Sequence, residues 1–191
     1  MGSLIAKYAT LRESALIGGA NFAAFSIFWT ALSFYVEGAP YHYSSQIAGL
    51  FGLIGAAGAL GAPVVGRLAD RISTKWMIGA LIVLDLLAYV LFGMLGASLW
   101  ALIAGVILLD LGVQGTQVAN QTRIYALEPA ARSRLNTVQM VTTFAGGALG
   151  STVGSYAWHI WGWSGVCLAG GGAVLFSFAV WLAHRIRRES P

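Results

Sequence analysis

Charged residues are scarce in this chain. Asp, Glu, Lys and Arg make up 9% of its 191 residues, whereas hydrophobic residues make up 58%. A soluble domain of this length could not bury so much apolar surface. The shortage of charge therefore excludes an ordinary water-soluble domain and favours the lipid bilayer as the surrounding solvent.

Cysteine and histidine are rarer still. The single cysteine, Cys167, supports neither an internal disulfide nor a metal site, and we interpret it as a small packing residue. The three histidines are scattered without the spacing of metal ligands. The sequence therefore predicts no metal and no cofactor.

Long uncharged runs divide the chain. Residues 38–66 hold no charged side chain, residues 76–122 hold only Asp85 and Asp110, and residues 135–184 hold none. A spanning helix needs about 20 apolar residues, so a run of about 50 residues suits two spans. The pattern predicts an all-α membrane protein with a segment at 1–13, a six-helix bundle over 14–184 and a tail at 185–191. The six transmembrane helices are expected near 14–36, 45–65, 76–96, 99–120, 136–158 and 164–184.

The basic residues indicate an orientation. With six spans both ends lie on one side, and this side receives all 11 lysines and arginines. Because Lys and Arg mark the cytoplasmic face, we expect both termini in the cytoplasm and the bundle in the cell inner (plasma) membrane. Orientation accounts for the net charge of +4 without a nucleic-acid partner. The other side carries aromatic residues that suit an interfacial belt: Tyr35, Tyr41, Tyr43, Trp100, Trp158, Trp161 and Trp163.

One short stretch gathers charge. Residues 66–75 read GRLADRISTK and hold Arg67, Asp70, Arg71 and Lys75. A cytoplasmic turn explains the three basic residues through the positive-inside rule. It does not explain Asp70.

This stretch resembles the signature loop of the major facilitator superfamily, approximately G-x-L-A-D-R-x-G-R-K. Ser73 and Thr74 stand where the family has a glycine and a basic residue, a weakening common in the second copy of the loop. Residues 120–140, NQTRIYALEPAARSRLNTVQM, resemble the loop between helices ten and eleven of drug- and sugar-efflux-type members. The resemblance covers nearly the whole chain and implies the C-terminal half of a twelve-helix transporter. The matching positions of the signature loop are Gly66, Leu68, Ala69, Asp70, Arg71 and Lys75.

The resemblance also implies a gating role for this loop. In the family, the loop aspartate caps the N-terminus of a helix in the opposite half, where free N–H groups and the helix dipole favour negative charge. Asp70 would be this cap, and Arg67 and Arg71 would belong to a charged cluster that closes the cytoplasmic side. A plain topological turn is the alternative.

Polar residues within the predicted spans form a second candidate site. Asp110 is followed by Gln114, Gln117 and Gln121 at i+4, i+7 and i+11, which share one helical face. A carboxylate at the bilayer centre costs about 2.5–3.5 kcal/mol on insertion scales. The stripe is therefore either the wall of an aqueous cavity or a set of interhelical hydrogen bonds. The resemblance implies the cavity, because this helix lines the central cavity in the family.

A second carboxyl, Asp85, lies at a depth similar to that of Asp110 on the antiparallel neighbouring helix. Protons could be carried on either group. The family places the helix of Asp85 toward lipid, which favours a structural role for that residue. The first span adds Asn21, Trp29 and Thr30, which either face a substrate or pack within the bundle.

Small residues recur in two spans. Gly146, Gly150 and Gly154 are spaced by four residues, which permits close contact between helix backbones in lipid. This pattern serves either static packing or the sliding of helices during alternating access. In a second span, glycines recur every three residues, so the surface without side chains shifts gradually around the helix. These glycines are Gly49, Gly52, Gly55, Gly58 and Gly61.

One short motif is compatible with an enzymatic function. Residues 162–165, GWSG, match the nucleophile turn of rhomboid-type intramembrane proteases. That mechanism needs a histidine at similar depth on a partner helix. His159 lies on the same outer loop and His184 near the opposite face, so no catalytic residue is assigned and the chain is not expected to be an enzyme.

Together these patterns predict transport of a small solute by alternating access, and the resemblance implies proton-coupled efflux. A non-transporting six-helix scaffold or partner subunit is the alternative. One half of a carrier holds half a site. The chain is therefore expected to be a fragment or truncated reading frame whose partner is the N-terminal half, or to pair with a second copy of itself.

Overall fold

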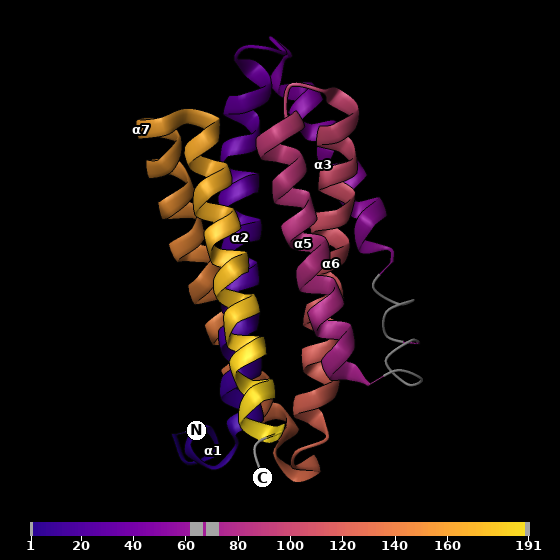
Figure 1. Ribbon diagram of the computed structural model, residues 1–191, viewed down its shortest axis with the longest axis vertical. Helices are drawn as coiled ribbons and strands as arrows, with labels where there is room; N and C mark the ends of the chain where they lie inside the picture. Colours follow the sequence, from indigo (N-terminus) through magenta and orange to yellow (C-terminus); the bar gives the residue numbers. More distant parts are fainter. Residues whose placement is uncertain (1, 62–66, 68–72, 190–191) are drawn as a thin grey trace.

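The computed structural model describes residues 2–61, 67 and 73–189, and nearly all of these are helical (Figure 1). The prediction of an all-α fold is therefore confirmed. Short turns join most of the helices, and a 3-10 helix, η1 (Pro129–Ala131), precedes the last one. The helices are α1 (Gly2–Lys7), α2 (Ala9–Glu37), α3 (Ser45–Ala59), α5 (Thr74–Leu95), α6 (Leu99–Tyr125) and α7 (Arg132–Glu189).

Helix α7 reverses direction at a single residue. Gly162 has φ 57° and ψ −144°, and a positive φ is strained for residues that carry a side chain. Figure 1 shows the chain after Gly162 running back beside the chain before it. We call residues 132–161 the first arm of α7 and residues 163–189 its second arm.

Four helices of the described chain are long and apolar enough to cross a membrane. They are α2, α5, α6 and the stretch Pro129–Ile186, which holds both arms of α7. Helix α3 contributes a shorter apolar segment, Gly49–Gly58. The predicted span at 45–65 is thus described as a helix only over Ser45–Ala59, since residues 62–66 lie outside the described part of the chain.

Ion pairs lie at one end of the bundle, and a cluster of stacked aromatic rings lies at the other. Helix α1 and the end of α7 lie at one end (Figure 1), where Lys7 pairs with Glu128 at 3.3 Å. At the other end Tyr35 stacks on Trp163, with ring centroids 3.7 Å apart. The Trp163 indole donates a hydrogen bond to the Phe92 carbonyl, so these rings pack into the bundle as well as marking its rim.

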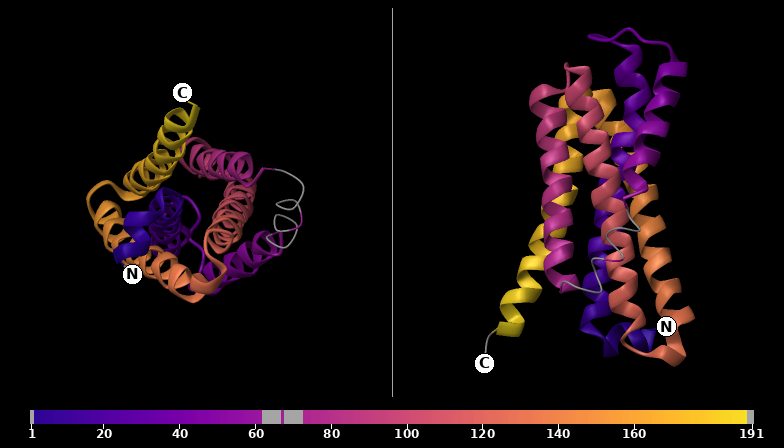
Figure 2. Two further views of the ribbon diagram at one scale, coloured as in Figure 1. Left: turned by 90° about the horizontal axis from the view of Figure 1, so that it is seen from below. Right: turned by 90° about the vertical axis from the view of Figure 1, so that its right-hand side faces the viewer.

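Helix α2 occupies the centre of the packing, as the end-on view in Figure 2 shows. Its Phe28 ring stacks on Phe92 of α5 at 4.3 Å between centroids. Tyr89 of α5 donates to the Ala24 carbonyl of α2 at 2.6 Å, and Ser177 of the second arm donates to another α2 carbonyl. Helix α2 therefore joins the two arms of α7 to α5.

The glycine stripe of the first arm fits against the backbone of α2. A Cβ atom on Gly154 would lie 2.9 Å from Ile27, and Cβ atoms on Gly146 and Gly150 would overlap the carbonyls of Gly19 and Ala23. These helices approach so closely because no side chain separates them. The stripe therefore lies in the contact between the first arm of α7 and α2.

The glycine run of α3 divides between two surfaces. Gly55 and Gly58 face α6, and a Cβ on Gly58 would lie 2.8 Å from the Ile107 carbonyl. Gly49 and Gly52 face open space, with no heavy atom within 4 Å of a Cβ. A repeat of three residues drifts around a helix of 3.6 residues per turn, which explains the division.

Candidate functional site

Asp110 and Trp29 meet at the crossing of α2, α3 and α6. A Cβ atom on Gly55 of α3 would lie 3.0 Å from Asp110 Oδ2 and 2.8 Å from the Trp29 ring, so the missing side chain of this glycine leaves room for both. Asp110 is 5% exposed. Its Oδ2 and the Trp29 Nε1 are buried and have no hydrogen-bond partner among the described residues. This crossing therefore offers a donor and an acceptor to water or to a solute.

Asp85 is more fully buried than Asp110 and lies in a polar contact between α2, α5 and α6. The Asn21 side-chain amide donates to Asp85 Oδ2 at 3.0 Å, and Asp85 is fully buried. A Cβ on Gly112 of α6 would overlap Asp85 Oδ1, so this glycine makes room for the carboxyl. Asp85 thus points into the bundle and binds a neighbouring helix.

A second polar group lies beside this contact. Gln139 and Thr143, on the first arm of α7, are buried next to Gly18 of α2, where a Cβ would lie 3.4 Å from the Thr143 hydroxyl. A cavity of about 10 Å³, also lined by Thr116, adjoins Thr143 and is about large enough for one water. Sequence reasoning missed Gln139, Thr143 and Thr116, because single neutral polar residues in an apolar run carry little signal. The spacing of Gln139 and Thr143 by four residues was the one available hint.

The glutamines of the α6 stripe remain accessible. Gln114, Gln117 and Gln121 are half-buried, as is Thr30 of α2. Gln117 also lines the small cavity between α2, α6 and the first arm. The stripe therefore begins at the contact of Asp110 with α3 and continues beside α2, with its glutamines neither sealed nor fully exposed.

Most of the predicted gating loop lies outside the described residues, including Gly66, Asp70 and Arg71. Arg67 is exposed. Lys75 is exposed in the first turn of α5 and lines a cavity of about 290 Å³. The gating cluster stays a prediction.

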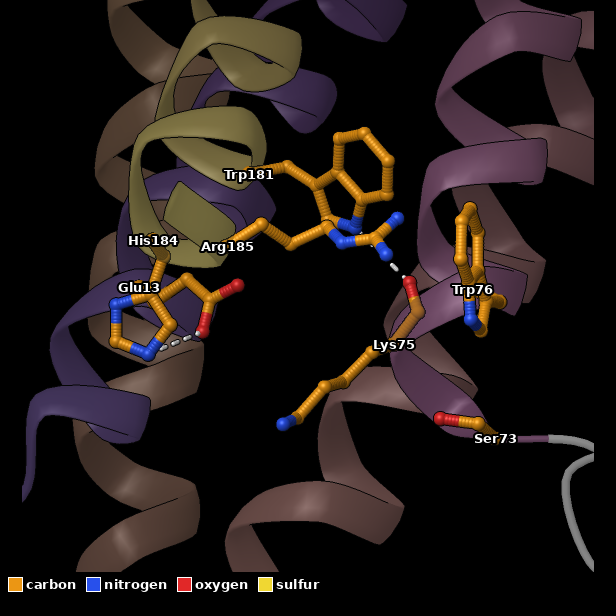
Figure 3. Close-up of a pocket in the computed structure, with 7 residues that line it drawn as sticks. All are labelled: Glu13, Ser73, Lys75, Trp76, Trp181, His184 and Arg185. Carbon is orange, nitrogen blue, oxygen red and sulfur yellow. Dashed lines mark hydrogen bonds and ion pairs between the residues drawn. The ribbon is translucent and has the colours of Figure 1, made fainter. Parts of the chain in front are cut away.

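A buried ion pair, which sequence reasoning missed, joins three helices at the charged end. Glu13 of α2 accepts a hydrogen bond from Arg123 of α6 at 2.5 Å and lies 3.2 Å from His184 of the second arm (Figure 3). The Glu13 and Arg123 side chains are only 5% and 7% exposed. In the sequence, Glu13 stands directly before the first predicted span, 14–36. Its pairing with a residue 110 positions away needs the folded chain to become visible.

A second, exposed contact ties the N-terminal segment to the loop after α6. The Tyr8 hydroxyl donates to Glu128 at 2.7 Å, and Lys7 lies 3.3 Å from the same oxygen. The Tyr8 hydrogen bond and the Lys7 charge lower the pKa of Glu128. The carboxylate therefore stays ionised at neutral pH and keeps both contacts.

The apolar helices and the polar groups between them define a multi-pass membrane protein. Residues 14–191 match the profile of the Major Facilitator Superfamily, and the chain belongs to that family. Members of the family are membrane transporters and are generally not enzymes.

Curated relatives agree with this assignment. The putative uncharacterized transporter YgaY of Escherichia coli K12 is 42% identical over 193 residues, which cover all of this chain and 49% of the relative. The probable transporter SCO4007 of Streptomyces coelicolor is 34% identical over 180 residues, which cover 94% of this chain and 40% of that relative. The chain therefore spans about half the length of the curated relatives that it matches.

Proposed function

We propose that this chain is the C-terminal six-helix half of a carrier that moves a small solute across the inner membrane by alternating access. Its membership of the family and its match to about half of each relative support this proposal. The six spans would be α2, α3 with the residues that follow it, α5, α6 and the two arms of α7. The termini at 1–13 and 185–191 would lie in the cytoplasm, as the basic end of the bundle suggests.

The observation that carries the proposal is that buried polar groups on α6 and α2 lack hydrogen-bond partners among the described residues. Helices of a dry scaffold bond their polar side chains to one another, because an unpaired group in hydrocarbon is costly. Here the buried Asp110 Oδ2 and Trp29 Nε1 have no partner in the described part of the chain. Gln114 and Gln117 are half-buried. An aqueous path beside α6 would satisfy all of them.

Cysteine labelling tests whether the stripe faces water. In a Cys167→Ala background, Gln114→Cys and Gln117→Cys are expected to react with a membrane-impermeant maleimide in sealed vesicles. The matched control is Val113→Cys, on the same turn of α6 but 3% exposed, which is expected to stay unlabelled. If neither glutamine position reacts from either side of the membrane, the stripe is dry and the chain is a scaffold or partner subunit.

The missing wall of the pathway would come from a second six-helix half. In a twelve-helix carrier the halves are related by an axis along the membrane normal and the site lies between them. The partner is either the N-terminal half of the same carrier or a second copy of this chain. The open glycine face of α3 at Gly49 and Gly52 offers a smooth surface for such a contact.

Asp110 is the proposed carrier of the coupling proton, and Asp85 is the second candidate. An ionised carboxylate inside the membrane is costly. A carboxyl group that alternates between water and a closed site is therefore expected to release its proton in water and to hold a proton when the site is closed. Among the described residues no lysine or arginine pairs with either carboxyl. Asp110 adjoins the accessible stripe, whereas Asp85 is sealed by Asn21 and Gly112.

The coupling proposal predicts that Asp110→Asn reduces proton-driven transport at least tenfold in everted vesicles of the completed carrier. A thermal-shift screen would first identify a solute, and a pH-sensitive dye would then report proton movement. Solute binding and solute exchange are expected to persist, because the amide keeps the size and polarity of the site. Asp85→Asn, which can still accept from Asn21, tests the second candidate: loss of coupling in this variant alone would assign the proton to Asp85. Unchanged proton movement in Asp110→Asn would end the proposal.

A further inference from the structure

A small polar cavity lies where α2, α6 and the first arm of α7 meet. Its volume is about 10 Å³, and each helix contributes one polar side chain to its wall, namely Asn21, Thr116 and Thr143. These three residues are 1%, 1% and 2% exposed. Among the described residues, no charged side chain lines the cavity. The cavity is therefore a neutral polar space enclosed by three helices.

The two threonine hydroxyls of this cavity differ from those of other helical threonines in the chain. A threonine in a helix can donate its hydroxyl hydrogen to the carbonyl one turn earlier. Several threonines make this bond at 3.0–3.1 Å: Thr122, Thr137, Thr142 and Thr152. The hydroxyls of Thr116 and Thr143 are buried and have no hydrogen-bond partner among the described residues. Both hydroxyls can therefore bond to a molecule in the cavity.

Asn21 connects the cavity to Asp85. The Asn21 side-chain nitrogen donates to Asp85 Oδ2 at 3.0 Å. The oxygen of the same amide is buried and has no partner in the described part of the chain. Because the nitrogen and the oxygen of an amide point in different directions, this oxygen needs a donor other than Asp85. A donor in the cavity would hold the amide in the orientation that the contact with Asp85 requires.

We propose that the cavity binds one water molecule, which donates to Asn21 Oδ1 and accepts from the hydroxyls of Thr116 and Thr143. A cavity of this volume holds about one water, and a buried water makes about three hydrogen bonds. The three side chains supply two donors and one acceptor, which one water satisfies. An apolar molecule would leave all three groups unpaired, and a divalent cation would find no carboxylate ligand among the described lining residues.

The water would act on Asp85 through Asn21. Thr116 and Thr143 are then positioning residues, because they hold the water that orients the amide, and the amide binds the carboxyl of Asp85. A contact between α2 and α5 would thus depend on side chains from α6 and from the first arm of α7. The water site requires only the packing of these helices. Its presence or absence can be measured whether or not the chain belongs to a working carrier.

Water-edited solid-state NMR of the chain in lipid bilayers tests for this water. The experiment transfers magnetisation from water protons to nearby isotope-labelled side chains. In a chain labelled at asparagine, threonine and alanine, we expect transfer to Asn21, Thr116 and Thr143, although all three are buried. Ala24, fully buried one turn further along α2, is the internal reference and should receive none. If neither threonine receives magnetisation, the cavity is dry and the proposal is wrong.

Hydroxyl-deleting variants test whether the water orients Asn21. Thr116→Val and Thr143→Val keep the size of the side chain, and each should abolish water transfer to the other threonine and shift the Asn21 side-chain ¹⁵N resonance. Thr143→Ser retains the hydroxyl and should keep both signals. Thr142→Val is the matched control, since its hydroxyl donates to the Val138 carbonyl at 3.0 Å. An equal shift of the Asn21 resonance in Thr142→Val would indicate general repacking and would overturn the assignment.

Melting temperatures in detergent test whether one water serves both hydroxyls. Thr116→Val and Thr143→Val should each lower the melting temperature by about 2–4 °C, the shift expected for about one lost hydrogen bond in a chain of this length. Either substitution would already release the shared water, so the double variant should melt close to the single variants. Two losses that add fully would show that the hydroxyls act separately, which contradicts a shared water.

Discussion

Replacing Gly150 with leucine is expected to prevent the first arm of α7 from packing on α2. A Cβ atom at this position would lie 2.7 Å from the Ala23 Cα and 2.9 Å from its carbonyl carbon. Backbone atoms cannot rotate aside as the end of a side chain can. Overpacking costs about 1–3 kcal/mol, and more where two helices must separate. We expect a large loss of monodisperse protein in size-exclusion chromatography and a lower melting temperature in detergent.

Gly172→Leu is the matched control for this prediction. Gly172 lies in the second arm, is exposed, and has no heavy atom within 4 Å of a built Cβ. The same exchange should leave the melting temperature unchanged or raise it slightly, because leucine favours helix over glycine by up to about 1 kcal/mol. Gly150→Ala should fall between the two. If Gly150→Leu melts like the control, the first arm does not pack on α2 as described.

The sequence was informative about where helices lie and less so about where they end. Hydropathy placed the first span at 14–36, whereas α2 covers Ala9–Glu37. A charged residue ends an apolar window, yet a helix continues through it where the charge finds a partner. Glu13 is such a residue, since it is buried against Arg123. The same reasoning explains why α6 continues to Tyr125, past the predicted end at 120.

The last two predicted spans, 136–158 and 164–184, leave residues 159–163 for the turn between them, and the structure turns at Gly162. Hydropathy could not select this residue from the aromatic stretch around it. The choice depends on backbone conformation, because a φ of 57° favours glycine. The two tryptophans that flank this glycine would be strained there.

The polar site was predicted in part. Periodicity placed Asp110 and the glutamines on one face of a helix, and counting residues placed Asp85 at a similar depth. The partners of these groups could not be derived, because Asn21 and Asp85 are 64 positions apart and meet only through packing. Gly55 and Gly112 illustrate the same limit: both leave room for a carboxyl on another helix, which their own sequence spacing does not reveal.

Breaking the buried ion pair at the charged end is expected to destabilise the protein strongly. Glu13→Ala would leave the Arg123 guanidinium, whose side chain is 7% exposed, without the carboxylate that it contacts. Removing one partner of a buried pair costs about 3–5 kcal/mol, because the remaining charge keeps its desolvation cost. We expect a loss of this size in the free energy of unfolding, measured by reversible denaturation in mixed micelles.

The exposed pair of Lys7 and Glu128 provides the comparison. The Lys7 side chain is 61% exposed and that of Glu128 31%, so water solvates each charge when the other is removed. Lys7→Met should therefore change stability little. Equal losses in Lys7→Met and Glu13→Ala would show that burial does not distinguish the two pairs.

A double substitution separates a lost attraction from a stranded charge. If the cost of Glu13→Ala comes mainly from the uncompensated Arg123 guanidinium, then Glu13→Ala combined with Arg123→Met should recover most of the stability lost by Glu13→Ala alone. If it comes from the ionic attraction holding α2, α6 and the second arm together, the double variant should stay as unstable as the single one. Buried ion pairs are commonly no more stabilising than apolar residues of similar volume, so we expect recovery. On that result the pair would fix which helix ends meet at the charged end, while the apolar packing along α2 would supply the stability.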